Sequence, residues 1–323
     1  MPVPPARPQS PVERMGLGLA AVGRPGYITL GRERDLPAAR TFATMRRRTY
    51  ELLDLAHARG IRYVDTARSY GHAEEFLSNW LASRRPSRSL LVASKWGYAY
   101  TGSWNTHAPV PEVKDHSVRS YDRQVAETRS WLGSRLDLYQ VHSVTPDSPA
   151  LTDTALHRRL AALATAGVTV GLTTSGPGQR DAIRAALDLT VDGRPLFRSV
   201  QATWNLLETS AGPALAEAHE AGLTVIVKEA LANGRLAQPR PVHPVLASLT
   251  EATNAPCDAV ALAAALHQPW ARIVLSGAAT THHLTANLLA TELSLSPDQL
   301  TQLSGMAETP QTYWSHRSRL PWN

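Results

Sequence analysis

The sequence predicts an α/β protein folded as a single (β/α)8 TIM barrel, and three observations support this fold class. Short apolar runs recur along the 323 residues, each followed by a turn and then by an amphipathic stretch. Most of these runs lack apolar–polar alternation, which is typical of parallel strands buried on both faces. No Pro- or Ser-rich linker divides the chain internally. Strands alternating with helices in one domain favour a barrel, whose active site we expect at the carboxyl ends of the strands.

The predicted strands are apolar runs of about five to seven residues. They cover 17–22, 61–65, 90–94, 136–142, 168–172, 199–203, 223–227 and 272–276. Between them, Phe76, Leu77 and Trp80 share one face of a predicted helix. Gly60 and Gly222 follow two other amphipathic stretches, where glycine commonly ends a helix. A doubly wound open sheet is the competing fold, but no G-x-G-x-x-G dinucleotide fingerprint follows the first strand.

The domain limits follow from composition and spacing. Residues 1–14 are rich in proline and lack an apolar run, so we expect a disordered tail there. The barrel is expected over 15–323, with a long loop at 96–117 and a C-terminal loop at 305–323. Loops longer than about 15 residues are usually functional or disordered.

Composition excludes several classes of function. The hydrophobic content of 43% is typical of a globular protein, and no stretch approaches about 18 continuous apolar residues, so no membrane span is expected. The single cysteine, Cys257, excludes an intrachain disulfide and fits a reducing compartment, so we expect a cytoplasmic protein. The net charge is +6, but the basic residues outside 46–48 are scattered, so no nucleic-acid partner is expected. No metal site is expected either.

Lysine is rare in this chain. Of the 33 basic residues only Lys95, Lys114 and Lys228 are lysine, and the rest are arginine. The abundance of Arg and Ala resembles the coding bias of high-GC bacteria, so we expect a bacterial source. Because an ammonium is a compact charge with a readily shifted pKa, each lysine invites a local explanation.

Polar residues close three consecutive predicted strands. Asp65, Lys95 and His142 end the second, third and fourth strands, and Tyr70 follows in the loop after the second. Alone, Asp65 would be a helix N-cap, His142 a core histidine, Lys95 a side chain that extends to solvent, and Tyr70 a rim aromatic. Because neighbouring strand ends meet at one mouth of a barrel, their joint placement favours a shared site.

The four residue types together suit proton transfer. An ammonium beside a phenol favours the phenolate, so we expect Lys95 to lower the pKa of Tyr70 from its ordinary value. Asp65 would keep Lys95 charged and oriented, and His142 would orient a carbonyl oxygen or help relay the proton. A tyrosine placed in this way is a general acid for a carbonyl that accepts a hydride.

The segment at 60–75, GIRYVDTARSYGHAEE, resembles the G-x-R-x-x-D-T-A-x-x-Y-G-x-E motif of the aldo/keto reductase superfamily. The tripeptide ASK and the segment QVHS resemble its lysine and histidine segments, and the resemblance extends from about residue 16 to residue 290. It implies a (β/α)8 barrel that binds NAD(P)H in extended form without a Rossmann fold. It also implies a catalytic tetrad of Asp65, Tyr70, Lys95 and His142.

The resemblance further implies a set of cofactor-binding residues. They are Thr173, Thr174, Gln201, Lys228, Glu229, Leu231, Gly234, Gly277, Ala278, His283 and Asn287. Lys228 stands where the family has a nicotinamide-stacking tyrosine, and Ala279 where an arginine for the 2′-phosphate often lies. Lys228 would contact a phosphate or the carboxamide, or would instead pair with an acid. The implied cofactor is NADP(H) or NAD(H), with NADP(H) slightly favoured.

Aromatic residues predict the substrate side. Trp96, Tyr98 and Trp104 lie in the long loop, and Trp204 follows the sixth predicted strand, where it could also stack on the cofactor. Trp314 and Trp322 lie in the C-terminal segment. Single aromatics usually pack a loop against the barrel, but together these suggest an aromatic-walled pocket. We therefore expect a small, hydrophobic or aromatic carbonyl or alcohol as substrate, bound by a monomer or a homo-oligomer.

The function predicted from the sequence is an NAD(P)H-dependent oxidoreductase. It would reduce an aldehyde or ketone to an alcohol, or run the reverse reaction, with Tyr70 as general acid. Two alternatives stay open: a regulatory or redox-sensing barrel that binds the cofactor with negligible turnover, and a barrel lyase or isomerase without net redox chemistry.

Overall fold

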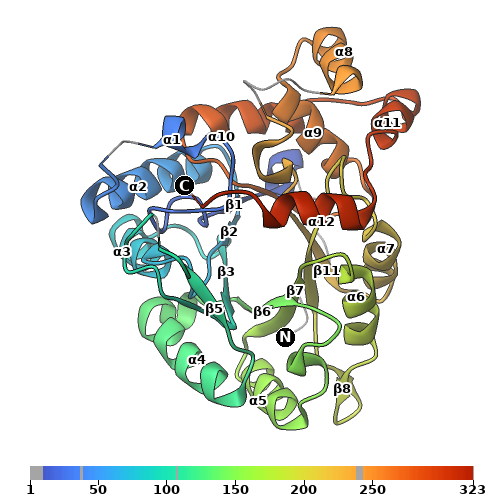
Figure 1. Cartoon of the computed structure of the whole chain (residues 1–323). Helices are drawn as coiled ribbons and strands as arrows, with labels where there is room; N and C mark the ends of the chain where they lie inside the picture. Colours follow the sequence, from blue (N-terminus) through green and yellow to red (C-terminus); the bar gives the residue numbers. More distant parts are fainter. Residues whose placement is uncertain (1–9, 37–38, 107, 238–242, 323) are drawn as a thin grey trace.

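Eight parallel strands close into one barrel in the computed structural model, with the helices outside it (Figure 1). The structure describes residues 10–36, 39–106, 108–237 and 243–322. The order around the barrel is β1-β12-β11-β10-β7-β6-β3-β2. The strands are β1 (Met15–Gly18), β2 (Tyr63–Asp65), β3 (Leu91–Trp96), β6 (Leu138–Val144), β7 (Thr169–Thr174), β10 (Ser199–Thr203), β11 (Thr224–Lys228) and β12 (Ile273–Ser276). The predicted fold class is confirmed.

Seven of the predicted strands lie within two residues of an observed one, but the first prediction was wrong. The run at 17–22 is apolar, yet the strand is Met15–Gly18 and the chain then turns. Leu19 accepts backbone hydrogen bonds from Val22 (3.1 Å) and from Gly23 (3.0 Å) in that turn. Leu19 and Val22 are buried, because the turn packs into the core. Their apolar character therefore reflects burial and not strand geometry.

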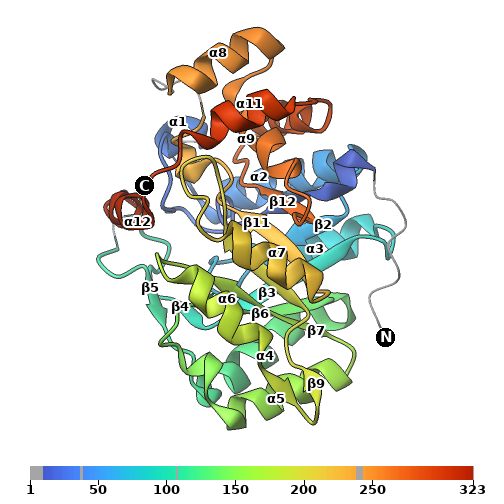
Figure 2. The ribbon, with the colours of Figure 1, turned by 90° about the vertical axis from the view of Figure 1, so that its right-hand side faces the viewer.

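Helices surround the barrel (Figure 2). They are α1 (Arg32–Asp35), α2 (Phe42–Ala58), α3 (Ala73–Arg84), α4 (Val118–Leu132), α5 (Thr154–Thr165), α6 (Gln179–Leu187), α7 (Gly212–Glu220), α8 (Pro244–Thr253), α9 (Cys257–Leu266), α10 (Thr281–Leu288), α11 (Pro297–Ser304) and α12 (Pro310–Ser318). Short 3₁₀ helices occur at Pro11–Arg14, Gly133–Arg135, Pro149–Leu151, Ala232–Gly234 and Leu289–Thr291. Within the described ranges, no helix combines the length and the apolar character that crossing a membrane would need.

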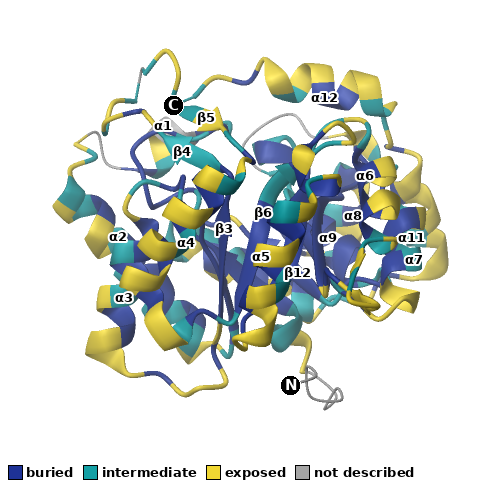
Figure 3. Ribbon diagram, turned by 90° about the horizontal axis from the view of Figure 1, so that it is seen from below, coloured by how far each residue is buried: buried dark blue, intermediate teal, exposed yellow. Residues whose placement is uncertain are grey.

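Local chemistry explains where several helices begin and which face they bury. The side chains of Thr41, Ser117 and Asp153 accept hydrogen bonds from backbone N–H groups in the first turns of α2, α4 and α5. These bonds satisfy donors that have no partner inside a helix. On α3, the predicted apolar face that includes Phe76 and Trp80 is buried, as expected. Exposed residues lie on the outward faces of the helices, and the barrel strands are buried (Figure 3).

The interior of the barrel has an apolar layer and a polar layer. Tyr63, Ala93, Leu138, Ile226, Ile273 and Leu275 form one buried apolar cluster. Successive side chains of a strand point to opposite faces, so the residue two positions further along faces the same interior. By this rule Asp65, Lys95 and Lys228 follow Tyr63, Ala93 and Ile226 toward the carboxyl ends of β2, β3 and β11. These three charged residues form the polar layer, which lies at the carboxyl ends of the strands, at the mouth of the barrel.

Three predicted segment boundaries need correction. Part of the predicted tail, Pro11–Arg14, is a 3₁₀ helix, and the Arg14 guanidinium donates to the carbonyl oxygen of Ala271 (2.9 Å). Residues 1–9 lie outside the described residues. The predicted loop at 96–117 contains the antiparallel strands β4 (Tyr98–Tyr100) and β5 (Glu112–Lys114), and residue 107 is not described.

The C-terminal segment at 305–323 is not a loop, because it contains helix α12. Figure 3 shows α12, β4 and β5 at the same end of the barrel, where the polar layer opens. A further antiparallel pair, β8 (Thr190–Val191) and β9 (Arg194–Pro195), precedes β10.

A close contact inside the barrel makes Gly171 sensitive to substitution. A Cβ at Gly171 would lie 2.2 Å from Ser199 Oγ and 3.0 Å from the Ser199 carbonyl oxygen. We expect Gly171→Ala to lower the free energy of unfolding by about 1–3 kcal/mol, measured by urea denaturation, because an added methyl overpacks the interior. The matched control is Gly18→Ala, whose Cβ would meet only the Ser276 carbonyl oxygen at 3.5 Å. Equal stability of the two variants would contradict the prediction.

Candidate active site

The four residues predicted as a tetrad lie together at the mouth of the barrel. Asp65 ends β2, Lys95 lies in β3, His142 lies in β6, and these strands are neighbours. The Lys95 ammonium forms a buried ion pair with Asp65 and donates hydrogen bonds to the Thr66 carbonyl oxygen (2.9 Å) and to Tyr70 Oη (3.3 Å). Two strands and one loop therefore place an acid, an ammonium and a phenol in direct contact.

Asp65 has partners on both of its carboxylate oxygens. Lys95 donates to Oδ2, and the Gln201 side-chain amide donates to Oδ1 across the barrel (2.9 Å). Gln201 is a predicted cofactor residue, and it lines the cavity while its amide nitrogen is bound to Asp65. The carboxylate is thus held in the barrel interior by charge and by a neutral donor.

The pKa of Tyr70 is raised well above its ordinary value, so the expectation that Lys95 would lower it was wrong. Burial of the phenol is the largest cause, and the Asp65 carboxylate adds to it, whereas the nearby Arg24 guanidinium opposes it. The Lys95 charge is already balanced by Asp65, so its effect on the phenol is small. The phenol is therefore protonated at neutral pH, which is the state that a proton donor requires.

His142 is a neutral imidazole. Burial lowers its pKa well below its ordinary value, and the nearby charges of Lys95, Lys228 and Arg24 lower it further. Its ring stands at 79° to the Tyr70 ring, with the ring centroids 5.6 Å apart. Among the described residues, no group hydrogen-bonds its Nδ1 atom. A neutral ring beside the phenol can donate a hydrogen bond to a ligand oxygen.

A cavity of about 690 Å³ begins at these residues and extends toward α10 and α1. Asp65, Tyr70, Tyr98, His142 and Gln201 line one end. The other predicted residues in its lining are Lys228, Glu229, Leu231, Gly234, Gly277, Ala278, His283 and Asn287. Lys95 lies behind Asp65, fully buried. Most of the predicted site residues therefore face one space, although they come from segments far apart in the sequence.

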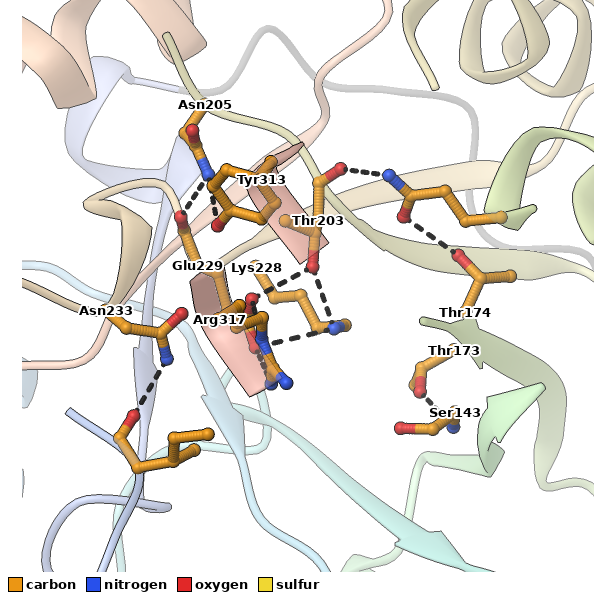
Figure 4. A network of polar contacts seen from close by, with 12 residues as sticks. Ser143, Thr173, Thr174, Thr203, Asn205, Lys228, Glu229, Asn233, Tyr313 and Arg317 are labelled. Carbon is orange, nitrogen blue, oxygen red and sulfur yellow. Dashed lines mark hydrogen bonds and ion pairs between the residues drawn. The ribbon is translucent and has the colours of Figure 1, made fainter. Parts of the chain in front are cut away.

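Thr173 and Thr174 are not part of the cavity lining. Both are fully buried, and Thr173 Oγ1 accepts a hydrogen bond from the backbone N–H of Ser143 (2.7 Å), as Figure 4 shows. The pairing of β6 with β7 is irregular between Val141 and Val144, and Ser143 has a positive φ of 56°. The bulge directs Ser143 toward the cavity, and Ser143 and Ser175 line it instead.

Three of the four predicted aromatic residues do not reach the cavity, and only Tyr98 does. Side chains alternate along β3, so Trp96 points outward where Lys95 points inward, and its ring packs 5.0 Å from that of Tyr121 on α4. Trp104 Nε1 donates to the Arg40 carbonyl oxygen (2.7 Å). The Trp204 ring packs against that of Trp270, with the centroids 5.7 Å apart.

Several cavity residues were not found from the sequence. Arg24 donates from Nη1 to Glu112 Oε1 and to the Ser69 carbonyl oxygen, both at 2.7 Å. Its guanidinium lies 4.7 Å from the centroid of the Trp322 ring and 5.4 Å from that of Tyr70. These contacts join the turn after β1, the β5 strand and the C-terminal segment, so no local pattern marks them. Tyr27, which the sequence did not indicate, lines the cavity together with Trp322 of the C-terminal segment, where aromatic lining was expected.

The end of β11 carries a second group of charges, shown in Figure 4. Arg317 of α12 donates from Nε to Glu229 Oε2 (2.9 Å), and its Nη2 atom contacts the other carboxylate oxygen. Lys228 donates from Nζ to Thr203 Oγ1 (3.0 Å) and lies 3.8 Å from Glu229 Oε1. Thr203 in turn donates to Glu229 Oε2 (3.2 Å). This network ties the C-terminal helix to the mouth of the barrel.

The network shifts the pKa values of its members. The charges of Arg317 and Lys228 outweigh burial and lower the pKa of Glu229 to about 2. Burial lowers the pKa of Lys228 to about 8, with the charges of Arg317 and Lys95 acting in the same direction and that of Glu229 opposing them. Glu229 is therefore ionised at neutral pH, whereas Lys228 can lose its proton in mildly alkaline solution.

The cavity suits an extended nucleotide cofactor. Its volume lies in the range of small-molecule sites, and it runs from the tetrad toward the N-terminus of α10. A Cβ added at Gly277 would meet no atom within 4 Å, so the backbone there borders open space. Backbone N–H groups at the start of a helix are suited to a phosphate. Leu231, Gly234, Ala278 and His283 would hold the nucleotide along this path.

Asn287 is fixed from within the protein at the far end of the cavity. Its side-chain amide donates to Asp258 Oδ2 (2.9 Å) and accepts from Ser276 Oγ (2.8 Å). The residue is buried yet still borders the cavity. The orientation of its side chain is therefore fixed before a nucleotide binds beside it.

Fold and site together define a (β/α)8 barrel with a carboxylate, an ammonium and a phenol in contact at its strand ends. A model of the aldo/keto reductase family matches residues 26–308. Because this match covers most of the chain, the protein belongs to the aldo/keto reductase family, as its motifs suggested.

Individual relatives are more distant. The aldo-keto reductase str7 of Strobilurus tenacellus is 26% identical over 144 residues, which are 44% of this chain and 36% of that protein. The chain thus matches about a third of the length of that relative. An aldo-keto reductase from Bacillus halodurans, solved in its holo form, superposes with a TM-score of 0.68 at 22% identity and covers 92% of both chains. A Pseudomonas aeruginosa protein provisionally assigned as an aldo-keto reductase superposes with a TM-score of 0.62 at 23% identity. The match covers 88% of this chain and 94% of the Pseudomonas chain. These structures support the fold.

The Glu229–Arg317 pair predicts a dependence of stability on pH. The folded-state pKa of Glu229, about 2, lies below its ordinary value of 4.5, so its contribution is complete above pH 4.5 and is lost as the pH falls toward 2. At neutral pH we expect Glu229→Gln to lower the free energy of unfolding by on the order of 3 kcal/mol. Urea midpoints at successive pH values should show this difference shrinking below pH 4.5. The control is Glu220→Gln at an exposed position of α7; a constant difference for Glu229→Gln would refute the assignment.

Proposed function

We propose that the protein is a nicotinamide-dependent oxidoreductase that reduces an aldehyde or ketone to an alcohol, or runs the reverse reaction. The observation that carries the proposal is the contact of the protonated Tyr70 phenol with the Lys95 ammonium at the inner end of the cavity, where Nζ and Oη lie 3.3 Å apart. Family membership points to the same reaction class.

Each residue of the tetrad has a defined part in this proposal. A bound nicotinamide cofactor supplies or accepts the hydride. Tyr70 donates its proton to the carbonyl oxygen, and the Lys95 ammonium stabilises the phenolate that remains. Asp65 keeps Lys95 oriented. The neutral His142 ring donates a hydrogen bond to the same carbonyl oxygen, which stabilises the negative charge that develops there.

The lining of the inner cavity supports a partly apolar substrate. Tyr27, Tyr98 and Trp322 present aromatic surface near Tyr70 and His142. Aromatic walls with a few convergent polar groups are typical of sites for small organic molecules.

One observation supports the alternative of a cofactor-binding sensor. Gln201, Thr173 and Thr174, which the family resemblance assigns to the carboxamide, are bound to other protein groups. A sensor would bind NADH or NADPH but would not consume it in a panel of aldehydes and ketones, so turnover decides between the two functions.

Replacement of the proton donor tests the reaction. We expect Tyr70→Phe to lower kcat by at least about 100-fold, because general acid catalysis contributes about 10²–10⁴. Cofactor Kd, measured by fluorescence titration, should stay nearly unchanged. The control is Tyr98→Phe, which removes a hydroxyl from the same cavity but keeps the ring that packs against His142, so it should retain most of the turnover. Near-normal kcat in Tyr70→Phe would exclude Tyr70 as the acid.

For the cofactor we propose a preference for NAD(H), which reverses the expectation from the sequence. Near α10 and α1, the described cavity lining contains the carboxylates of Asp35 and Asp258 against the single guanidinium of Arg34. Asp35 also lies 3.6 Å from the His283 ring. A 2′-phosphate would add negative charge to a region with an excess of carboxylates, whereas a ribose hydroxyl would not.

Fluorescence titration of NADH and NADPH measures this preference. We expect the wild type to bind NADH more tightly. Ala279→Arg should lower the Kd of NADPH by roughly tenfold and leave that of NADH little changed, because a guanidinium pairs with phosphate. Ala279 is buried, so Asp35→Asn provides a second variant at a partly exposed position, with the same direction of change. A wild type that prefers NADPH would contradict the proposal.

A further inference from the structure

The Lys228 side chain extends from the last residue of β11 into the inner part of the cavity. It is 15% exposed, and Figure 4 shows its ammonium beside the Thr203 hydroxyl. Thr203 is a neutral acceptor at 3.0 Å, and an ammonium carries three donors. The contact with Thr203 therefore orients Lys228 without balancing its charge.

The other cations of the inner cavity have carboxylate partners at contact distance. Lys95 pairs with Asp65, Arg24 with Glu112 at 2.7 Å, and Arg317 with Glu229. His142 adds no charge, because its imidazole is neutral. Lys95 lies behind Asp65 and outside the cavity lining, but its charge occupies that carboxylate. Among the described residues at this end of the cavity, four cations therefore face three carboxylates, and Lys228 is the surplus positive charge.

Glu229 balances Lys228 only in part, because it is shared: it forms an ion pair with Lys228 and a closer one with Arg317. Arg317 contacts both of its carboxylate oxygens, and Lys228 Nζ stays 3.8 Å from the nearer one, which is beyond hydrogen-bond distance. Bidentate arginine–carboxylate pairs are among the strongest in proteins, so Arg317 is the favoured partner of Glu229. A cation that is largely removed from water is costly unless an anion accompanies it.

We propose that Lys228 binds a carboxylate of the substrate, so that the substrate is an oxo acid or the corresponding hydroxy acid. The carbonyl part of this inference rests on the proposed reductase function. One surplus positive charge matches one carboxylate, whereas a phosphate dianion would leave a net negative charge in the cavity. Tyr70 and His142 would hold the carbonyl oxygen while Lys228 holds the acid group, which fixes the orientation of the substrate.

The subsite has a pH dependence with a defined sign. The groups around Lys228 are Thr203 and Glu229, the Arg317 guanidinium, and the more distant Lys95, Asp65 and His142. With a Lys228 pKa of about 8, the ammonium is present below pH 8 and is lost above it. Carboxylate binding should therefore weaken as the pH rises through 8, while binding of a neutral analogue should not.

Phenylglyoxylate and its neutral methyl ester are the probes for turnover, with saturating cofactor and the full chain. We expect Lys228→Gln to lower the ratio of kcat/KM for the acid over that for the ester by at least about tenfold, because hydrogen bonds to charged groups are strong. Lys228→Arg should keep most of the ratio. The control is Lys114→Gln, an exposed lysine of β5 outside the cavity lining, which should leave the ratio unchanged.

Benzoate and benzamide test the subsite without turnover, by calorimetric titration of the same variants. Wild type and Lys228→Arg should bind benzoate more tightly than benzamide, and Lys228→Gln should lose that difference. A protein that shows this pattern but reduces no carbonyl would overturn the proposed reductase function and leave the subsite standing.

Two outcomes would overturn the subsite. One is equal discrimination between acid and neutral probe in the wild type and Lys228→Gln, with both proteins folded by circular dichroism. The other is a loss of NADH affinity in Lys228→Gln without a change in discrimination, which would assign the ammonium to the cofactor.

Discussion

The buried ion pair between Lys95 and Asp65 is the interaction on which the geometry of the site depends. Both groups lie in the barrel interior, where an isolated charge costs several kcal/mol. The pair is tolerated because Gln201, the Thr66 carbonyl oxygen and Tyr70 satisfy the remaining hydrogen-bonding capacity. Those same contacts fix the position of the Tyr70 phenol. The residues that stabilise the buried ion pair are therefore also the residues that position the phenol proposed as the proton donor.

Two further ion pairs hold the walls of the cavity. The contact between Arg24 and Glu112 joins the segment after β1 to the β4–β5 hairpin, and the aromatic rings of Tyr70 and Trp322 pack around Arg24. The contact between Arg317 and Glu229 joins α12 to β11. Each pair links segments far apart in the chain. Because Arg317 belongs to α12, the cavity wall at β11 depends on the folded C-terminal segment. Lys228 stands among these pairs as the charge that a ligand can neutralise.

Two of the described residues with a positive φ stand at strand ends that border the site. Ser143 follows His142 with a φ of 56°, and Glu229 follows Lys228 with a φ of 54°. Such conformations cost energy in residues other than glycine and persist only where neighbours enforce them. The Thr173 hydroxyl holds the backbone of Ser143, and Arg317 and Asn205 hold the side chain and carbonyl of Glu229. The strained positions turn the chain at the two strand ends where ligand would lie.

The sequence by itself determined the barrel, seven of its strands and the meeting of Asp65, Tyr70, Lys95 and His142, because buried parallel strands leave an apolar signature and their ends share one mouth. It did not determine the pKa of Tyr70, which depends on burial and on the pairing of Lys95 with Asp65. Nor did it determine which aromatic rings line the cavity. Trp96 faces outward because Lys95 faces inward, whereas Tyr27 and Trp322 reach the site only through contacts between distant segments. The direction of Trp96 follows from the alternation of side chains along β3 once Lys95 faces inward. Only the tertiary structure decided the pKa of Tyr70 and the positions of Tyr27 and Trp322, because burial and contacts between distant segments leave no local pattern in the sequence.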